Sequence, residues 1–263
     1  MFLEINGFRM AYESLGKGIP LLFIHGFPLN RRMWDPQMQS LSHHLRVLAP
    51  DLRGHGDSES VEGPCNLDML ADDCVKMLDA LDIPQPAVVC GLSMGGYTTL
   101  AMYRRYPERI RGLILAATRA GADSPDGKAN RDKAISQAEK DGAAATAASM
   151  LPKLMSPKTY KSNPDLIKQV ERIMTSTSVT GIIGALESMK TRPDSTPYLG
   201  EITVPTLIIH GEDDQLIPFQ EAQSMHAAIP GSTLVLISSA GHLPNLEQPE
   251  LFNQAVDEFI EKL

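Results

Sequence analysis

The sequence predicts an α/β fold in which a mostly parallel β-sheet is flanked by helices. Short apolar runs alternate with segments whose apolar residues recur at helical spacing, and a purely helical stretch interrupts this alternation once. A chain of 263 residues can hold one large domain that carries an insertion. We therefore expect a core made of residues 1–120 and 200–263, with residues 121–199 forming a helical cap over a site.

The first 120 residues contain the first half of this core. Asn6-Gly7 is a hairpin signal between two strands, Phe2–Ile5 and Arg9–Leu15. The runs that read as further strands, most of them apolar enough to be buried on both faces, are Leu21–Ile24, Arg46–Pro50, Ala87–Cys90 and Leu113–Ala116. The expected helices are Leu67–Leu81, with Asn66 as its N-cap, and Met94–Tyr106, which Pro107 ends.

The strand pattern disappears between Gly121 and Leu199. Asn163 and Pro164 are the N-cap and first-turn residues of a helix with one apolar face, and the Ala-rich stretch Ala143–Met150 also favours helix. Beyond Pro205 the alternation resumes. Its expected elements are strand Thr206–His210, helix Phe219–Ile229, strand Thr233–Ile237 and helix Pro249–Leu263.

Composition excludes several classes of function. The formal charge of −8 and the lack of a Lys/Arg-rich run argue against a nucleic-acid partner. The three cysteines, Cys65, Cys74 and Cys90, match no metal or redox spacing and are expected to be free thiols. The chain shows neither a signal peptide nor about 18 consecutive apolar residues, so we expect a cytoplasmic protein without a membrane partner.

The segment Gly91–Gly95, Gly-Leu-Ser-Met-Gly, has the sequence of a nucleophile elbow. It follows a predicted strand and precedes a predicted helix, so the turn exposes the Ser93 hydroxyl at the carboxyl edge of the sheet. Such a turn strains the backbone and needs small neighbours, which Gly91, Gly95 and Gly96 supply. The pentapeptide alone occurs often by chance. Its place between a predicted strand and a predicted helix favours a nucleophile elbow over a chance match.

A serine nucleophile needs a base and an acid that orients the base. His242 lies in the loop directly after the last predicted strand, where ligands bind in open α/β sheets, so we take it as the base. The acid is expected between Ser93 and His242 in the chain, after another strand. Asp213 and Asp214 both follow Thr206–His210, so either of them could be the acid.

Two backbone N–H groups should stabilise the oxyanion that forms when the hydroxyl attacks a carbonyl. One is expected from Met94, directly after the nucleophile, and the other from the loop after Leu21–Ile24. Phe27 is the candidate in that loop, because Pro28 has no N–H to donate.

These residues together resemble the α/β-hydrolase superfamily. The similar motifs occur in family order and are the loop His25–Pro28, the turn Asp51–Ser58, the elbow Gly91–Gly96, the acid loop Gly211–Pro218 and the histidine loop Gly241–Pro249. The resemblance implies an eight-stranded α/β-hydrolase fold with an inserted helical cap. The family aspartate stands three residues after the glycine, which implies Asp214 as the acid.

The chain looks most like small bacterial carboxylesterases and hydrolases of the 3-oxoadipate enol-lactonase type. The resemblance implies a carboxylic ester hydrolase that uses no metal and no organic cofactor, with a small ester or lactone as substrate. Short-chain esters are our first expectation. An enol-lactone hydrolase, a C–C hydrolase and a perhydrolase or acyltransferase remain alternatives on the same triad, and a non-catalytic binding module is an alternative of another class.

The apolar residues of the predicted cap allow two interpretations. Met150, Leu154, Met174 and Met189 either pack against the sheet domain and one another or line an adaptable acyl pocket.

Overall fold

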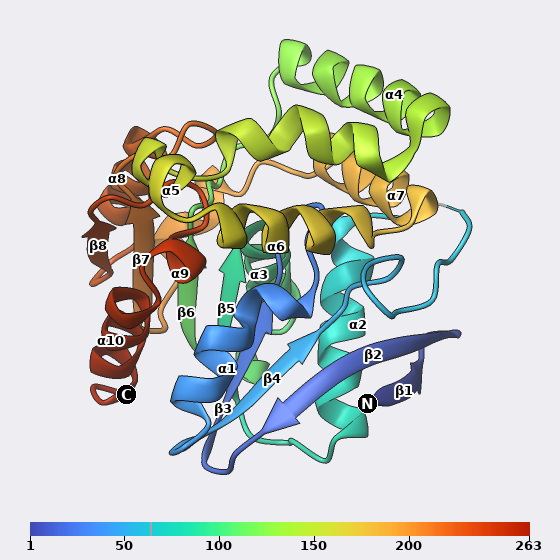
Figure 1. Cartoon of the computed structure of the whole chain (residues 1–263). Coiled ribbons are helices and arrows are strands. Elements are labelled where there is room, and N and C mark those ends of the chain that lie inside the picture. Colours follow the sequence, from blue (N-terminus) through green and yellow to red (C-terminus); the bar gives the residue numbers. More distant parts are fainter. Residues whose placement is uncertain (64) are drawn as a thin grey trace.

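The computed structural model describes residues 1–63 and 65–263 and contains one eight-stranded sheet in the order β1-β2-β4-β3-β5-β6-β7-β8 (Figure 1). The strands are β1 (Phe2–Ile5), β2 (Phe8–Leu15), β3 (Ile19–Ile24), β4 (Leu45–Pro50), β5 (Ala87–Leu92), β6 (Ile110–Ala116), β7 (Thr206–Gly211) and β8 (Thr233–Ile237). Only β2 runs against its neighbours β1 and β4, and all other pairs are parallel. The predicted fold class and strand number are therefore confirmed.

Helices cover both faces of this sheet (Figure 1). One face carries α2 (Leu67–Ala80), α3 (Met94–Arg105) and α8 (Phe219–Ala228), and the other carries α1 (Asp35–Leu41) and α10 (Pro249–Ile260). Side chains of β3 alternate between the two cores, with Leu22 and Ile24 in one and Leu21 and Phe23 in the other. This alternation explains the continuous apolar runs, because every position of a strand covered on both faces is buried.

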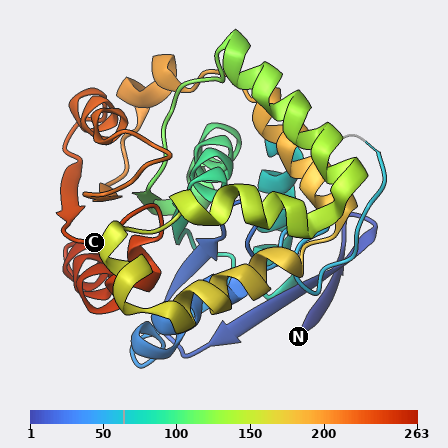
Figure 2. The same cartoon turned by 45° about the horizontal axis from the view of Figure 1, so that its top comes forward.

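A purely helical segment connects β6 to β7 and lies above the carboxyl ends of the strands (Figure 1). It consists of α4 (Pro125–Met150), α5 (Pro157–Ser162), α6 (Pro164–Thr175) and α7 (Val179–Lys190), with short 3₁₀ turns at Leu151–Lys153 and Thr196–Glu201. Gly142, at φ 77°, divides α4 into two arms that meet at an angle (Figure 2). The expected N-caps are present, because Asn66 accepts from Met69 N–H and Asn163 from Leu166 N–H.

Three elements were not expected from the sequence. Trp34 closes a 3₁₀ turn, Arg31–Trp34, and stacks on Phe23 with ring centroids 4.5 Å apart, and α1 continues directly from this turn. The short α9 (Pro244–Glu247) follows the last strand. The first arm of α4 is rich in charged residues and lacks an apolar stripe, so periodicity alone did not indicate it.

No helix in residues 1–63 and 65–263 is both long enough and apolar enough to cross a membrane.

Gly181, in the first turn of α7, lies at a close backbone contact between the helical segment and the core. A Cβ at this position would lie 2.1 Å from the carbonyl oxygen of Gly54. Gly54 itself has φ 75°, and its carbonyl accepts hydrogen bonds from the Ser178 hydroxyl at 2.9 Å and backbone N–H at 3.2 Å. Backbone therefore packs directly on backbone where α7 meets the core.

Gly181→Ala tests whether this contact outweighs helix propensity. Propensity alone would stabilise the variant by about 1 kcal/mol, whereas the overlap should destabilise it by about 1–3 kcal/mol. Urea unfolding measures the difference. Gly184→Ala on the same helix is the control, because its Cβ would meet only the Cys65 side chain, at 3.3 Å. A Gly181→Ala variant as stable as the unaltered chain would contradict the packing argument.

Candidate active site

Ser93 lies in the turn between β5 and α3 and has φ 55° and ψ −113°, a conformation that residues with a side chain rarely adopt. The neighbouring glycines allow this turn. A Cβ on Gly91 would lie 2.1 Å from the carbonyl oxygen of Gly95, and a Cβ on Gly95 would lie 2.1 Å from that of Ile24 at the end of β3. The start of α3 can therefore approach the sheet closely enough to present the serine.

The next strand holds the backbone of Ser93 in place. Its N–H donates to Ala116 O at 3.0 Å, and the Thr118 hydroxyl donates to Ser93 O at 2.8 Å. Thr118 also packs on Gly96, where a Cβ would lie 2.5 Å from the threonine hydroxyl oxygen. No motif in the sequence indicated Thr118, because β6 and β5 meet only through the fold.

The two predicted oxyanion donors flank this turn. A Cβ built on Gly26 would lie only 3.5 Å from Ser93 Cβ, which places the loop after β3 beside Ser93. Phe27 follows Gly26, and Met94 begins α3. Neither N–H donates a hydrogen bond to another described residue, so both remain available to a ligand.

Asp214 and His242 are in direct contact. His242 Nδ1 lies 2.8 Å from Asp214 Oδ2, and the other carboxylate oxygen accepts from the N–H groups of Leu216 at 2.8 Å and Ile217 at 3.0 Å. Burial alone would raise the pKa of Asp214. The charge and hydrogen bond of His242, with the two backbone donors, outweigh burial and hold this pKa below its ordinary value.

The state of Asp214 fixes the hydrogen on His242. Because an ionised carboxylate only accepts, Nδ1 must carry the hydrogen, and Nε2 of the neutral imidazole has a free lone pair. No hydrogen bond joins Ser93 Oγ to His242 Nε2 among the described residues, although both follow strands at the same edge of the sheet. Bonds of this kind are often long without substrate and shorten when it binds.

Asp213, the competing acid, is placed differently. Its backbone N–H donates to Ala240 O at 2.8 Å, and its carboxylate has no hydrogen-bond partner in the described part of the chain. Of the two neighbouring aspartates, only Asp214 reaches the imidazole. The structure therefore gives a geometric reason for the choice that the motif spacing implied.

Other buried histidines support the loops around the site. His25 accepts from Leu52 N–H at 3.0 Å through Nε2, so its Nδ1 donates to Gly26 O, also at 3.0 Å. Burial lowers the pKa of His25 to about 4 and that of His55, which lies against it, to about 3. His210 Nε2 lies 2.9 Å from Ile217 O, at the end of the acid loop. These contacts favour structural roles for His25, His55 and His210.

The comparisons with known proteins agree with this fold. The model of the alpha/beta hydrolase fold family matches residues 19–249. A 3-oxoadipate enol-lactonase of Acinetobacter baylyi is 30% identical, over 97% of this chain and 94% of that protein.

Solved structures show the same similarity. A thermophilic esterase from Thermogutta terrifontis superposes with a TM-score of 0.96 at 38% identity, covering 99% of this chain and 96% of the other. The enol-lactonase from Burkholderia xenovorans gives 0.93 at 29% identity, covering 99% and 100%. On these grounds, the chain belongs to the α/β-hydrolase fold family and is a hydrolase.

Proposed function

We propose that this hydrolase cleaves carboxylic esters through an acyl-enzyme on Ser93, with His242 as base and Asp214 as the orienting acid. The observation that carries the proposal is the 2.8 Å contact between His242 Nδ1 and Asp214 Oδ2. It occurs at the same sheet edge as the strained turn of Ser93. Near this turn lie the N–H groups of Phe27 and Met94, which donate to no other described residue.

The proposed mechanism follows from these positions. His242 Nε2 takes the proton of the Ser93 hydroxyl as its oxygen attacks the ester carbonyl, and Asp214 stabilises the imidazolium that results. The N–H groups of Phe27 and Met94 bind the tetrahedral oxyanion. The imidazolium then protonates the leaving alcohol. In the second half-reaction His242 takes a proton from water, which attacks the acyl-enzyme. The bond between the acyl carbon and Ser93 Oγ then breaks, the imidazolium returns the proton to that oxygen, and the acid is released.

Short-chain esters are the proposed substrates. Leu154, Met174 and Met189 in the helical segment are almost fully buried, and Met150 is half-buried. They belong to the two apolar cores, which favours the packing interpretation over an open acyl pocket. These four side chains therefore offer little free apolar surface to hold a long acyl chain.

An enol-lactone is the second candidate substrate. Two similar proteins, one with a solved structure, are named enol-lactonases and match this chain over nearly its whole length. A lactone is an intramolecular ester, so the same residues can open it through the same acyl-enzyme. A non-catalytic binding module is less well supported, because all three residues of the proposed triad are present.

Ser93→Ala tests the nucleophile. Without the hydroxyl no acyl-enzyme can form, so kcat for p-nitrophenyl acetate should fall by about 10³-fold or more while the melting temperature stays close to that of the unaltered chain. Ser224→Ala is the matched control, because that exposed hydroxyl bonds only within α8. Turnover by Ser93→Ala at the unaltered rate would exclude the mechanism.

Asp214→Asn and Asp213→Asn separate the two neighbouring acids. An amide at position 214 can donate to the imidazole and favour the wrong tautomer, so kcat should fall by about 10³- to 10⁴-fold. The change at position 213 should alter kcat by no more than about twofold, as for a surface change of ±0.5 kcal/mol. Steady-state kinetics at neutral pH measures both. The reverse order of effects would assign the role to Asp213.

A substrate panel tests the acyl preference. We expect kcat/KM to be highest for p-nitrophenyl acetate or butyrate and to fall as the acyl chain lengthens, because the buried cap side chains would have to move. Enol-lactones and β-diketones belong in the same panel, with Ser93→Ala as the background rate. A strong preference for long chains would contradict the short-chain proposal, and a β-diketone as best substrate would favour a C–C hydrolase.

A further inference from the structure

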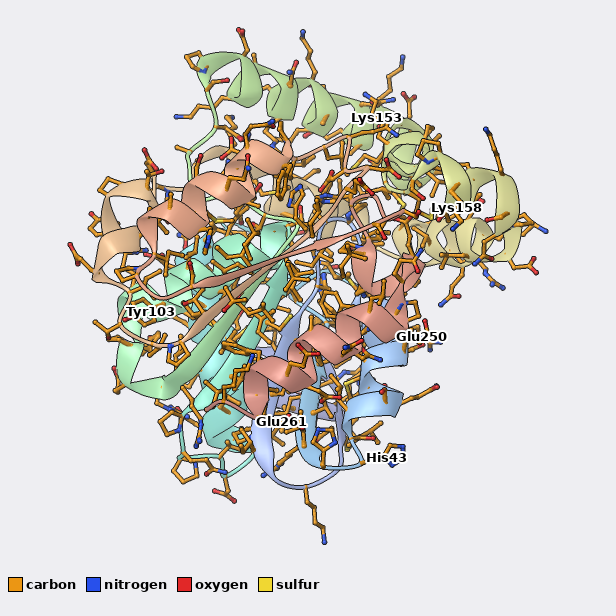
Figure 3. The ribbon with its side chains drawn as sticks, turned by 90° about the vertical axis from the view of Figure 1, so that its left-hand side faces the viewer. His43, Tyr103, Lys153, Lys158, Glu250 and Glu261 are labelled. Atoms are coloured by element: carbon orange, nitrogen blue, oxygen red, sulfur yellow. The ribbon has the colours of Figure 1, made fainter. Side chains whose placement is uncertain are left out.

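The helical segment contacts the histidine loop through Leu154–Thr159, which we call the α5 turn. Leu154 O accepts from His242 N–H at 2.9 Å, and the Ser156 hydroxyl lies 3.3 Å from Ser239 O. A Cβ on Gly241 would lie 2.7 Å from Met155 C and 2.8 Å from Ser156 N, so the two backbones touch. Lys153 and Lys158, labelled in Figure 3, mark where this part of the chain lies.

The Glu247 carboxylate joins the two sides of this contact. Its Oε1 accepts from Gly241 N–H at 2.6 Å, and its Oε2 accepts from Ser156 N–H and from the Thr159 hydroxyl, both at 2.7 Å. Short bonds to a charged acceptor are stronger than bonds between neutral groups. One side chain therefore holds the residue before His242 and the first turn of α5 at the same time.

These hydrogen bonds hold both the backbone and the ring of His242. The backbone of Gly241 is held by Glu247, that of His242 by Leu154, and the His242 ring by Asp214. Two of these three constraints involve the helical segment, because Leu154 belongs to it and Glu247 is hydrogen-bonded to Ser156 and Thr159. An error of about 1 Å in the position of a catalytic group can cost about 10²-fold in rate, so the support of this loop has a measurable consequence.

We propose that Glu247 is a positioning residue through which the helical segment sets the orientation of His242. The inference rests on the proposed role of His242 as base. Glu247 does not act on the substrate; it acts on the loop that carries the base. The formation of helix α5 does not require Glu247, because the Ser156 hydroxyl already caps that helix by accepting from Thr159 N–H at 3.2 Å. Glu247 only joins the helix to the histidine loop.

Glu247→Gln is the first variant. It keeps the size of the side chain, removes the charge and turns one of the two acceptor groups into a donor, which must then face an N–H or O–H. The kcat for p-nitrophenyl acetate should fall by about 10- to 100-fold with KM changed by no more than about twofold. Glu250→Gln is the matched control, since Glu250 lies exposed at the start of α10 (Figure 3).

Thr159 supplies a second variant in case Glu247→Gln does not fold. Thr159→Val removes one of the three donors and should lower kcat in the same direction by a smaller factor, whereas Thr159→Ser, which keeps the hydroxyl, should restore it. Thr175→Val makes the same change on α6, where the hydroxyl bonds only within its own helix. If the contacts act as one unit, Glu247→Gln and Thr159→Val combined should lower kcat by less than the product of the single effects.

The readouts separate positioning from simple stabilisation. Unaltered kcat in Glu247→Gln or, if that variant does not fold, in Thr159→Val, with only a lower melting temperature, would overturn the proposal. A change confined to KM would also overturn it, because it would assign the carboxylate to substrate binding. Ser93→Ala is run beside these variants. If Ser93→Ala retains full turnover, the proposed function itself fails, and that outcome is distinct from the other two.

Discussion

The backbone conformation of Ser93 is the constraint on which the rest of the site depends. A residue with a side chain at φ 55° costs about 1–3 kcal/mol, which the surrounding structure must offset. Gly91 and Gly95 remove the Cβ atoms that would collide, and hydrogen bonds from Ser93 N–H to Ala116 O and from Thr118 to Ser93 O fix the turn. The strain is local, and the hydrogen bonds that support the turn come from the end of β6 and from Thr118 just after it.

The parallel sheet brings the remaining groups to the same edge. The Phe27 loop follows β3, Asp214 follows β7 and His242 follows β8. Residues more than 200 positions apart in the chain therefore lie at the same edge of the sheet, where these strands end. Asp214 is held by two backbone donors of its own loop, and His242 by a residue of the helical segment. Asp214, the proposed acid, is therefore positioned locally, whereas His242, the proposed base, depends on a long-range contact.

The sequence predicted the features whose physical cause lies within a few residues. The caps at Asn66 and Asn163, the apolar strands and the strand–turn–helix around Ser93 were correct because each depends on local spacing. The charged first arm of α4 was not expected, because it has no apolar stripe to reveal it. The contacts of Thr118 and Glu247 join residues 25 and 91 positions apart, and no periodicity or motif encodes such pairs. The choice between Asp213 and Asp214 needed either the family spacing or the observed contact between Asp214 and His242.

We propose that Ser93 is the nucleophile and that His242 activates it. The most direct measurement is to titrate the protein with a fluorophosphonate, follow loss of p-nitrophenyl acetate turnover, and map the adduct by peptide mass spectrometry. We expect one adduct per chain on Ser93, with turnover lost in proportion to labelling. An adduct on another residue, or full turnover by fully labelled protein, would contradict it.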